Sequence, residues 1–410
     1  MKLNKDTIRK ISKKITLKGA AGILIVPMLI IPSLILKLIR KIEGKKVWLI
    51  CENGNTARDN GYVFYEYMKK NHPEIKSYFG ITFSSPDYKK VSQLGDCVKW
   101  GSLRHYLLFM SADENVTSHK EGEPNHTIFS ILHYLGLFNN RTFLQHGVLY
   151  HSMPMFYKKK SFFKVFITGA KDEYEMVNSE FGYNNNEVKY TGLARFDKLH
   201  NCKVDNKIIA LIPTWRRWLD TEEKFRESEY YATYQSLINN RELIKYLEKS
   251  DKYIYFYPHY STQRFIHLYS TPSERIKIIS AKDADIQVLI RKASMLITDY
   301  SSIFTDFAYM YKPVLFYQFD YSRTYARHYQ LDANTKAFHT EDKILGYAAK
   351  DEKSLVVTLK RIADKNYLLD KKIEKRINDF FVLNDTNNCS RIYSAIVESN
   401  KGNNGKQEKE

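Results

Sequence analysis

ITDYSSIFTDFAYMYKPVLFY, residues 297–317, is the stretch of sequence that decides the fold. An apolar run at 295–297 ends in the polar turn 298–302, and a segment with apolar residues at helical spacing follows. Pro313 closes that segment before a second apolar run begins at Val314. The pattern predicts a strand, a turn, a helix and a strand, which together form one βαβ unit of a parallel sheet.

Strand-like and helix-like segments also alternate through the rest of the chain. One series runs from Val47 and a second from Lys207, with the turn-rich 201–206 as the predicted linker. Such alternation is typical of doubly wound parallel sheets. We therefore predict an α/β protein with two Rossmann-like domains facing a cleft, at 47–202 and 203–397. The second includes terminal helices, and the polar 398–410 is expected to be disordered.

The charge of the chain is unevenly distributed. Its 410 residues carry a formal net charge of +18, and the first 46 hold twelve Lys or Arg against two acidic residues, which leaves +8 elsewhere. That balance fits an anionic substrate or a membrane surface. No nucleic-acid partner is expected, because zinc-finger spacings and RNA-binding aromatic motifs are missing from the sequence. Four scattered cysteines suit a reducing compartment and disfavour structural zinc.

Residues 1–46 predict a membrane-associating helical segment. Between Lys18 and Lys37 runs GAAGILIVPMLIIPSLIL, which is at the low edge of what spans a bilayer. Basic residues on both sides give a span no clear orientation, and Pro27 and Pro32 each remove a helix hydrogen bond. We favour a helix–break–helix that dips into the cytosolic leaflet. A true span and a buried helical hairpin stay open, whereas a cleaved signal peptide is not expected.

The turn 298–302 suits a phosphate group. Open α/β sheets bind ligands beyond the carboxyl ends of their strands, and free N–H groups at a helix start favour anions. Thr298, Ser301 and Ser302 are therefore candidate phosphate-binding residues, although a serine N-cap without a ligand is the alternative. Asp306 would lie one turn deeper on the same face. It is a candidate to accept ribose hydroxyls, and otherwise an exposed helix acid.

Two histidines follow apolar runs at predicted strand ends. His146 lies in FLQHGVLYHSMP and His259 in YIYFYPHYS, one in each predicted domain. A histidine at a strand end can act as a general base towards a hydroxyl, and a structural histidine bonded to a nearby carbonyl is the alternative for His146. Neither has the sequence spacing of a metal ligand, so no metal site is predicted.

Two arginines follow apolar strands in the same way. Arg195 lies in YTGLARFDKL and Arg216 in IPTWRRW, each at a Gly or Pro turn. Because guanidinium pairs bidentately with phosphate oxygens, an enzyme that handles a diphosphate needs such groups at strand ends. A surface or interdomain salt bridge is the alternative for each.

Together these residues resemble the CDP-glycerol glycerophosphotransferase family, which builds wall teichoic acid and related capsule polymers. The motifs occur in order as QHG at 145–147, TGLARFD at 191–197, IPTWRR at 212–217, YPH at 257–259, ITDYSS at 297–302 and KPVLFYQFD at 312–320. Departures from the family pattern lie on the presumed acceptor side: Gln145 replaces the usual Trp, and Val148, Leu149 and Tyr150 follow HG.

The resemblance implies a GT-B-like fold and transfer of a polyol phosphate, with glycerol favoured over ribitol. The donor would be CDP-linked and the acceptor a hydroxyl of a lipid-linked or polymeric glycan, with CMP released in teichoic acid or capsule synthesis. His146 would be the base, Asp306 would hold ribose, and no cofactor or metal is implied. The resemblance implies that His259 contacts the donor phosphates and that Arg216, Ser301 and Ser302 hold phosphate. We therefore predict His146 and His259 as catalytic residues. From their own positions, Thr298 and Arg195 are added to the predicted donor-phosphate contacts.

Two further expectations follow from the resemblance and the residues together. The protein is expected at the cytoplasmic face of the cell membrane as a peripheral or monotopic protein. The runner-up enzyme is a GT-B glycosyltransferase that uses a nucleotide sugar, and a membrane adaptor without chemistry is the non-enzyme alternative. Oligomeric state is not predicted.

Overall fold

The computed structural model describes residues 17–324, 326–327 and 343–407, with side chains described from Ile25 to Lys401. The chain folds into two compact units. The first unit contains residues up to 148, 152–197 and those from 385 onward, and the second contains 149–151 and 198–384.

The first unit is built on a seven-stranded parallel sheet in the order β3-β2-β1-β4-β5-β6-β7. The order reverses between β1 and β4, which is the topological switch point where doubly wound sheets bind ligands. Its strands are β1 (Lys46–Cys51), β2 (Ile75–Ile81), β3 (Cys97–Lys99), β4 (Glu114–Thr117), β5 (Arg141–Phe143), β6 (Val165–Thr168) and β7 (Val188–Tyr190).

Helices cover both faces of this sheet, because the side chains of β1 are apolar on both faces. Trp48 and Ile50 belong to one hydrophobic core, and Leu49 belongs to the core on the opposite face. A strand buried on both faces gives a continuous apolar run in the sequence. The helices are α2 (Leu17–Ile42), α3 (Asn60–Asn71), α4 (Tyr88–Leu94), α5 (Leu103–Ser111), α6 (His126–Tyr134), η1 (Pro154–Phe156), α7 (Lys158–Ser161), α8 (Lys171–Glu180), η2 (Ala194–Lys198) and α17 (Asn388–Gln407).

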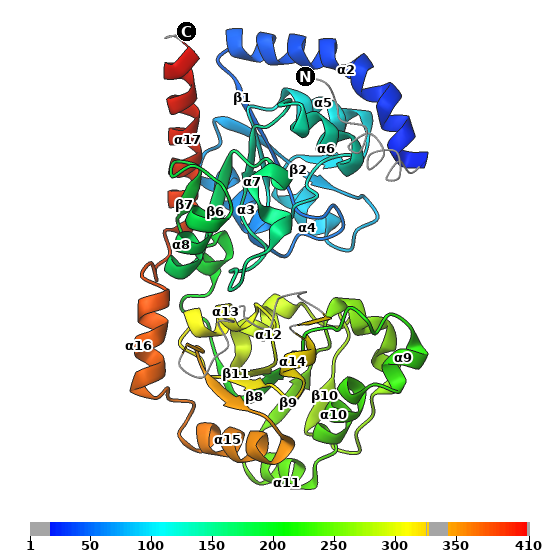
Figure 1. The fold of residues 1–410 in the computed structure, drawn as a ribbon, viewed down its shortest axis with the longest axis vertical. Helices are drawn as coiled ribbons and strands as arrows, with labels where there is room; N and C mark the ends of the chain where they lie inside the picture. The colour runs from blue at the N-terminus through cyan, green and yellow to red at the C-terminus, as the bar shows by residue number, and fades with distance from the viewer. Residues whose placement is uncertain (1–16, 325, 328–342, 408–410) are drawn as a thin grey trace. The chain divides into compact units, whose positions relative to one another are not determined.

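Helix α2 corrects the prediction for the amino-terminal segment. It is one continuous helix of 26 residues with both Pro27 and Pro32 inside it, so the predicted break and the helical hairpin are both wrong. The missing proline hydrogen bonds are accommodated by a bend, which Figure 1 shows along α2. Val26 packs into the core beneath Leu49, so α2 is part of the first unit. No helix in the described part of the chain is long and apolar enough to cross a membrane.

The second unit is built on a six-stranded parallel sheet in the order β10-β9-β8-β11-β12-β13. The predicted βαβ unit is confirmed: β11 and β12 are parallel neighbours, and a short helix joins them. The strands are β8 (Asp205–Leu211), β9 (Tyr253–Phe256), β10 (Ile276–Ile278), β11 (Ala293–Thr298), β12 (Val314–Tyr317) and β13 (Tyr347–Ala349).

Helices α12, α13 and α15 contact strands of this sheet, and α11 and α15 pack side by side (Figure 1). The sheet order reverses between β8 and β11, so this unit has its own switch point. The helices are α9 (Glu222–Arg226), α10 (Glu229–Leu237), α11 (Arg241–Lys249), η3 (Tyr260–Leu268), α12 (Ile286–Lys292), α13 (Phe304–Tyr309), α14 (Tyr321–Thr324), α15 (Glu352–Asp364) and α16 (Lys371–Phe380).

The carboxyl-terminal residues depart from the predicted domain boundaries. Residues from 385 onward belong to the first unit, whereas the prediction assigned 203–397 to the second domain. Ile392 and Ile396 of α17 lie in the core around Trp48. The backbone remains helical to Gln407, so the expectation of a disordered tail from 398 is wrong up to that residue.

Candidate active site

His146 lies just beyond the carboxyl end of β5, after a residue with an uncommon backbone conformation. Gln145 has a φ of +67°, which non-glycine residues adopt rarely and often at functional sites. Asn60 Nδ2 donates to the Gln145 carbonyl at 2.7 Å, and Gln145 Nε2 donates to Glu173 Oε1 at 3.0 Å. These buried contacts fix the direction in which the chain presents His146.

An Asp–His pair forms at this point. His146 Nδ1 lies 2.6 Å from Oδ2 of Asp59, which follows β1. An imidazole that donates from Nδ1 to a carboxylate keeps Nε2 as its proton-accepting nitrogen. The His146 side chain is 68% exposed, so a substrate hydroxyl can approach it. Partial desolvation disfavours the imidazolium, but the charge of Asp59 and its hydrogen bond outweigh this and raise the pKa of His146.

Arg195 belongs to the same cluster. Its Nη1 donates to Asp59 Oδ1 at 3.0 Å and to the His146 carbonyl at 2.8 Å, and its backbone N–H donates to Asn60 Oδ1 at 2.9 Å. The side chain is buried. Through these contacts in the first unit Arg195 holds the Asp–His pair, and its contact with a donor phosphate stays a prediction.

His119, at the end of β4, is a third member of this cluster. Its ring centroid lies 4.5 Å from that of His146, and its Nδ1 lies 3.0 Å from Ser118 Oγ. Burial, followed by the charge of His146, lowers the pKa of His119 to about 4, so its ring is neutral near pH 7. One ligand atom each from Asp59, His119 and His146 lies within 4.8 Å of the others, a spacing that can hold a metal ion.

The sequence reasoning missed Asp59 and His119. Both follow strands that meet at the switch point between β1 and β4, so topology brings them to His146 although they are far away in the sequence. Only their place in the sequence could have identified these two residues, because each is a titratable residue a few positions beyond an apolar run.

Arg216 corrects a prediction in the second unit. Its side chain is 0% exposed. Its Nη2 donates to Asp299 Oδ2 at 2.8 Å, and its Nε and Nη2 donate to the two carboxylate oxygens of Asp320 at 2.8 and 2.9 Å. Nη1 donates to the Thr214 carbonyl at 2.7 Å. A guanidinium so enclosed is a buried structural ion pair and does not contact a phosphate directly.

The ion pair nevertheless fixes the turn that follows β11. Asp299 Oδ1 accepts backbone N–H bonds from Thr214 at 2.7 Å and from Tyr300 at 2.6 Å. The loop after β8 and the turn before Ser301 are therefore held by one carboxylate, which Arg216 in turn holds.

The turn 298–302 divides into buried and accessible residues. Thr298 is fully buried and its hydroxyl donates to the Ile212 carbonyl at 2.6 Å, so its predicted phosphate contact is wrong. Ser301 and Ser302 are half-buried and precede α13. Asp306 is 1% exposed within α13, so its carboxylate does not face solvent, and its ribose role stays a prediction.

His259 begins η3 after β9 and is half-buried. Its Nδ1 accepts the backbone N–H of Ser261 at 3.1 Å, so Nε2 carries the proton when the ring is neutral. Trp215 stacks at a centroid distance of 6.0 Å. This tautomer suits donation of a hydrogen bond to an anionic oxygen.

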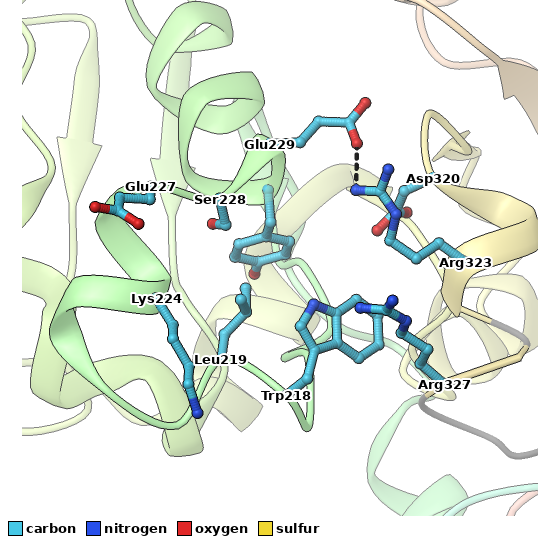
Figure 2. Close-up of a pocket in the computed structure, with 10 residues that line it drawn as sticks. Trp218, Leu219, Lys224, Glu227, Ser228, Glu229, Asp320, Arg323 and Arg327 are labelled. Carbon is cyan, nitrogen blue, oxygen red and sulfur yellow. Dashed lines mark hydrogen bonds and ion pairs between the residues drawn. The ribbon is translucent and has the colours of Figure 1, made fainter.

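A cavity of about 640 Å³ lies in the second unit. Figure 2 shows the Arg327 guanidinium over the ring of Trp218, at 5.9 Å from the centroid, and Arg323 paired with Glu229 at 2.7 Å. Asp320 also lines the cavity and links it to Arg216. Tyr230 lines the cavity too, and its buried hydroxyl finds no hydrogen-bond partner among the described residues. Aromatic and guanidinium surfaces of this kind suit a nucleotide.

A family model described as CDP-glycerol:poly(glycerophosphate) glycerophosphotransferase matches residues 33–398. The minor teichoic acid biosynthesis protein GgaB of Bacillus subtilis is 30% identical over 374 residues, which cover 86% of this chain and 40% of GgaB. A teichoic acid poly(glycerol phosphate) polymerase of Bacillus subtilis is 23% identical over 387 residues, covering 87% of this chain and 49% of the polymerase. The chain thus spans half or less of these relatives.

Among solved structures, the wall teichoic acid polymerase TagF matches with a TM-score of 0.64 and 18% identity, over 91% of this chain and 98% of that one. A TagF variant soaked with CDPG matches with a TM-score of 0.62 and 19% identity, over 88% and 90%. At this identity the likeness concerns the fold. It confirms the prediction of two Rossmann-like sheets of the GT-B kind.

Proposed function

The chain belongs to the CDP-glycerol:poly(glycerophosphate) glycerophosphotransferase family, and from this membership we propose that it transfers glycerol phosphate from CDP-glycerol to an acceptor hydroxyl. The acceptor is a growing glycerol phosphate polymer or a lipid-linked glycan, and CMP is released. The observation that carries the proposal is the Asp59–His146 pair at the switch point of the first sheet.

His146 is the general base in this proposal. Its Nε2 takes the proton of the acceptor hydroxyl as the hydroxyl oxygen attacks the β-phosphorus of CDP-glycerol. A new phosphorus–oxygen bond forms, and the bond from that phosphorus to the bridging oxygen breaks, so that CMP leaves with the bridging oxygen. Asp59 holds the ring through Nδ1 and stabilises the imidazolium that forms. Such a transfer needs mainly positioning and electrostatic stabilisation.

The donor contacts are proposed in the second unit. Ser301 and Ser302 precede α13, and the neutral His259 tautomer presents Nε2–H, so these groups suit the diphosphate oxygens. Arg216 supports them through Asp299 without touching the donor. The cavity beside Trp218 has the size typical of ligand sites, and we assign it to the cytidine end of the donor. TagF has been soaked with CDPG, which supports a donor of this class.

Membrane attachment is proposed through α2. The helix exposes a row of large apolar side chains together with Lys37 and Lys41. An apolar face with basic residues is the pattern of helices that lie in the interface of an anionic membrane. The protein would then work as a peripheral protein at the cytoplasmic face. The exposed apolar residues are Met28, Ile31, Leu34, Ile35, Leu38, Ile39 and Ile42.

We also propose that transfer needs no metal ion at the Asp59–His146 pair. Arg195 already donates to Asp59, and a guanidinium beside the carboxylate opposes a bound cation. A metal on His146 would also occupy a nitrogen of the proposed base. Transfer that is unchanged by a chelator supports this; transfer that stops and is restored by one added divalent metal contradicts it.

One assay tests the activity. The protein is incubated with CDP-glycerol, CDP-ribitol or UDP-sugars and a glycerol phosphate acceptor, and the nucleotide released is identified. CMP release from CDP-glycerol is expected, and a nucleoside diphosphate from a UDP-sugar would instead identify a glycosyltransferase. His146→Ala should lower the rate by about 10²–10⁴ if the ring is a general base. A variant with near-normal turnover removes that role.

A further inference from the structure

Glu52 follows directly after β1 and is fully buried beside the Asp–His pair. Its Oε1 accepts the backbone N–H groups of Asp59 and Tyr62, each at 2.9 Å, and its Oε2 accepts that of Arg58 at 3.1 Å. Three backbone donors thus converge on one carboxylate at the start of α3. A bond from a charged acceptor to backbone N–H groups is among the stronger kinds in proteins.

The start of α3 differs from an ordinary helix N-terminus. Asp59 is the N-cap residue, and an N-cap aspartate commonly accepts an N–H from the first turn of its own helix. Within the described residues, the Asp59 side chain makes no such bond. Glu52 takes the N–H of Tyr62 at the third helical position instead. The Asp59 carboxylate is thereby available to His146 and Arg195.

Gly61 makes this arrangement possible. A Cβ atom at Gly61 would lie 2.8 Å from Glu52 Cγ and 2.9 Å from the Cys51 carbonyl oxygen, closer than real Cβ contacts allow. Only a residue without a side chain lets the helix start approach Glu52 so closely.

We propose that Glu52 is a positioning residue for transfer: it caps α3 in place of Asp59 and so reserves the Asp59 carboxylate for His146. The proposal rests on the proposed function in that His146 is taken as the base. When Glu52 loses its charge, the Tyr62 N–H at the start of α3 loses its charged acceptor and attracts the Asp59 carboxylate, which turns from the imidazole towards the helix. His146 then loses both its orientation and the charge that favours its protonated form.

The test uses Glu52→Gln, which keeps the volume of the side chain. Glu114→Gln is the matched control: Glu114 is also fully buried in the first sheet, bonds Thr142 Oγ1 at 2.8 Å, and has its pKa raised by burial to about 7, as Glu52 does. The pKa of His146 is measured by NMR of the histidine-labelled 410-residue chain, with its signal identified by its loss in His146→Gln. Turnover is measured as CMP release.

In Glu52→Gln we expect a lower His146 pKa and a kcat lower by about tenfold, with the donor KM unchanged. That loss is smaller than the ~10⁴ known for removal of an orienting carboxylate from a catalytic triad. Glu114→Gln should leave the His146 pKa and the kcat per folded molecule at the wild-type values. In an Asp59→Asn background, Glu52→Gln should cause no further loss of kcat, and its effect on the His146 pKa should shrink to the direct influence of the Glu52 charge on the imidazole.

Two results would overturn the positioning role. One is a His146 pKa that stays at the wild-type value in Glu52→Gln; the other is an equal further loss of kcat in the Asp59→Asn background, as expected of general destabilisation. Failure of the proposed function would give a different experimental result. If no variant releases CMP but Glu52→Gln lowers the His146 pKa more in the wild-type background than in the Asp59→Asn background, the link from Glu52 through Asp59 to His146 stands and the transferase assignment falls.

Discussion

Replacing Arg216 by Met should destabilise the second unit strongly. The substitution removes the cation between Asp299 and Asp320 and leaves both carboxylates buried, with side-chain exposures of 0% and 4%. Breaking a buried ion pair by removing one partner costs about 3–5 kcal/mol. Asp299 keeps backbone donors from Thr214 and Tyr300, which places the expected loss in this range and not above it.

The effect is measured as the free energy of unfolding in urea and as the thermal midpoint. For a unit of this size, about 2–4 °C are lost per kcal/mol, so the midpoint should fall by roughly 6–20 °C. Arg217→Met is the control, because Arg217 is the exposed neighbour and surface substitutions usually change stability by less than about 0.5 kcal/mol. Adding Asp299→Asn and Asp320→Asn to Arg216→Met should restore part of the loss, since no unpaired charge is then buried.

A different outcome would show that Arg216 serves the substrate directly. The buried-pair reasoning would be refuted if the free energy of unfolding of Arg216→Met lay within about 1 kcal/mol of the wild-type value while its KM for CDP-glycerol rose steeply. So small a change is far below the loss expected for a broken buried pair. The guanidinium would then be a phosphate ligand, as its position after a strand first indicated.

Three further results are expected. Gly192→Ala should lower the free energy of unfolding in urea by more than about 1 kcal/mol, because the residue has a φ of +80° and a Cβ would lie 1.7 Å from Asn388 Oδ1; an unchanged midpoint would contradict this. Burial lowers the pKa of His105 from 6.5 to about 3, so its contribution to stability is complete above pH 6.5 and is lost as the pH falls towards 3, by about 1.4 kcal/mol per pH unit. In urea titrations, the free energy of unfolding of His105→Gln should depend less on pH between 6.5 and 3 than that of the wild type. A pH dependence parallel to that of the wild type would contradict this prediction. Leu34→Glu with Leu38→Glu on the exposed face of α2 should reduce sedimentation with anionic vesicles, and undiminished binding would exclude this face as the anchor.

The fold was predictable because its central strands are buried on both faces. Every residue of β11 is buried, so the strand appears as an uninterrupted apolar run followed by a polar turn, and β12 follows in the same way. Helix α2 was predicted less well. Proline was expected to break it, but a bend and the packing of Val26 against the first sheet keep the helix continuous.

The site was predictable only where one residue carries the signal. His146 and His259 are candidates because each follows a strand, and Ser301 and Ser302 because they follow another. Partners distant in the sequence could not be found in this way: Asp59 lies 87 residues before His146, and Asp299 and Asp320 lie 83 and 104 residues after Arg216. A sequence shows that an arginine follows a strand, but not which carboxylates enclose it.

The return of α17 to the first unit limits how segments can be exchanged between relatives. Asp197 accepts bonds from Asn388 Nδ2 at 2.7 Å and from the Cys389 backbone at 2.9 Å, and Tyr393 packs on Trp48. A chimera joined at one crossover near residue 197 would combine a sheet with a terminal helix from a different parent. Two crossovers, one on each side of 198–384, would transplant the second unit and keep each parent's helix with the sheet that it evolved to cover.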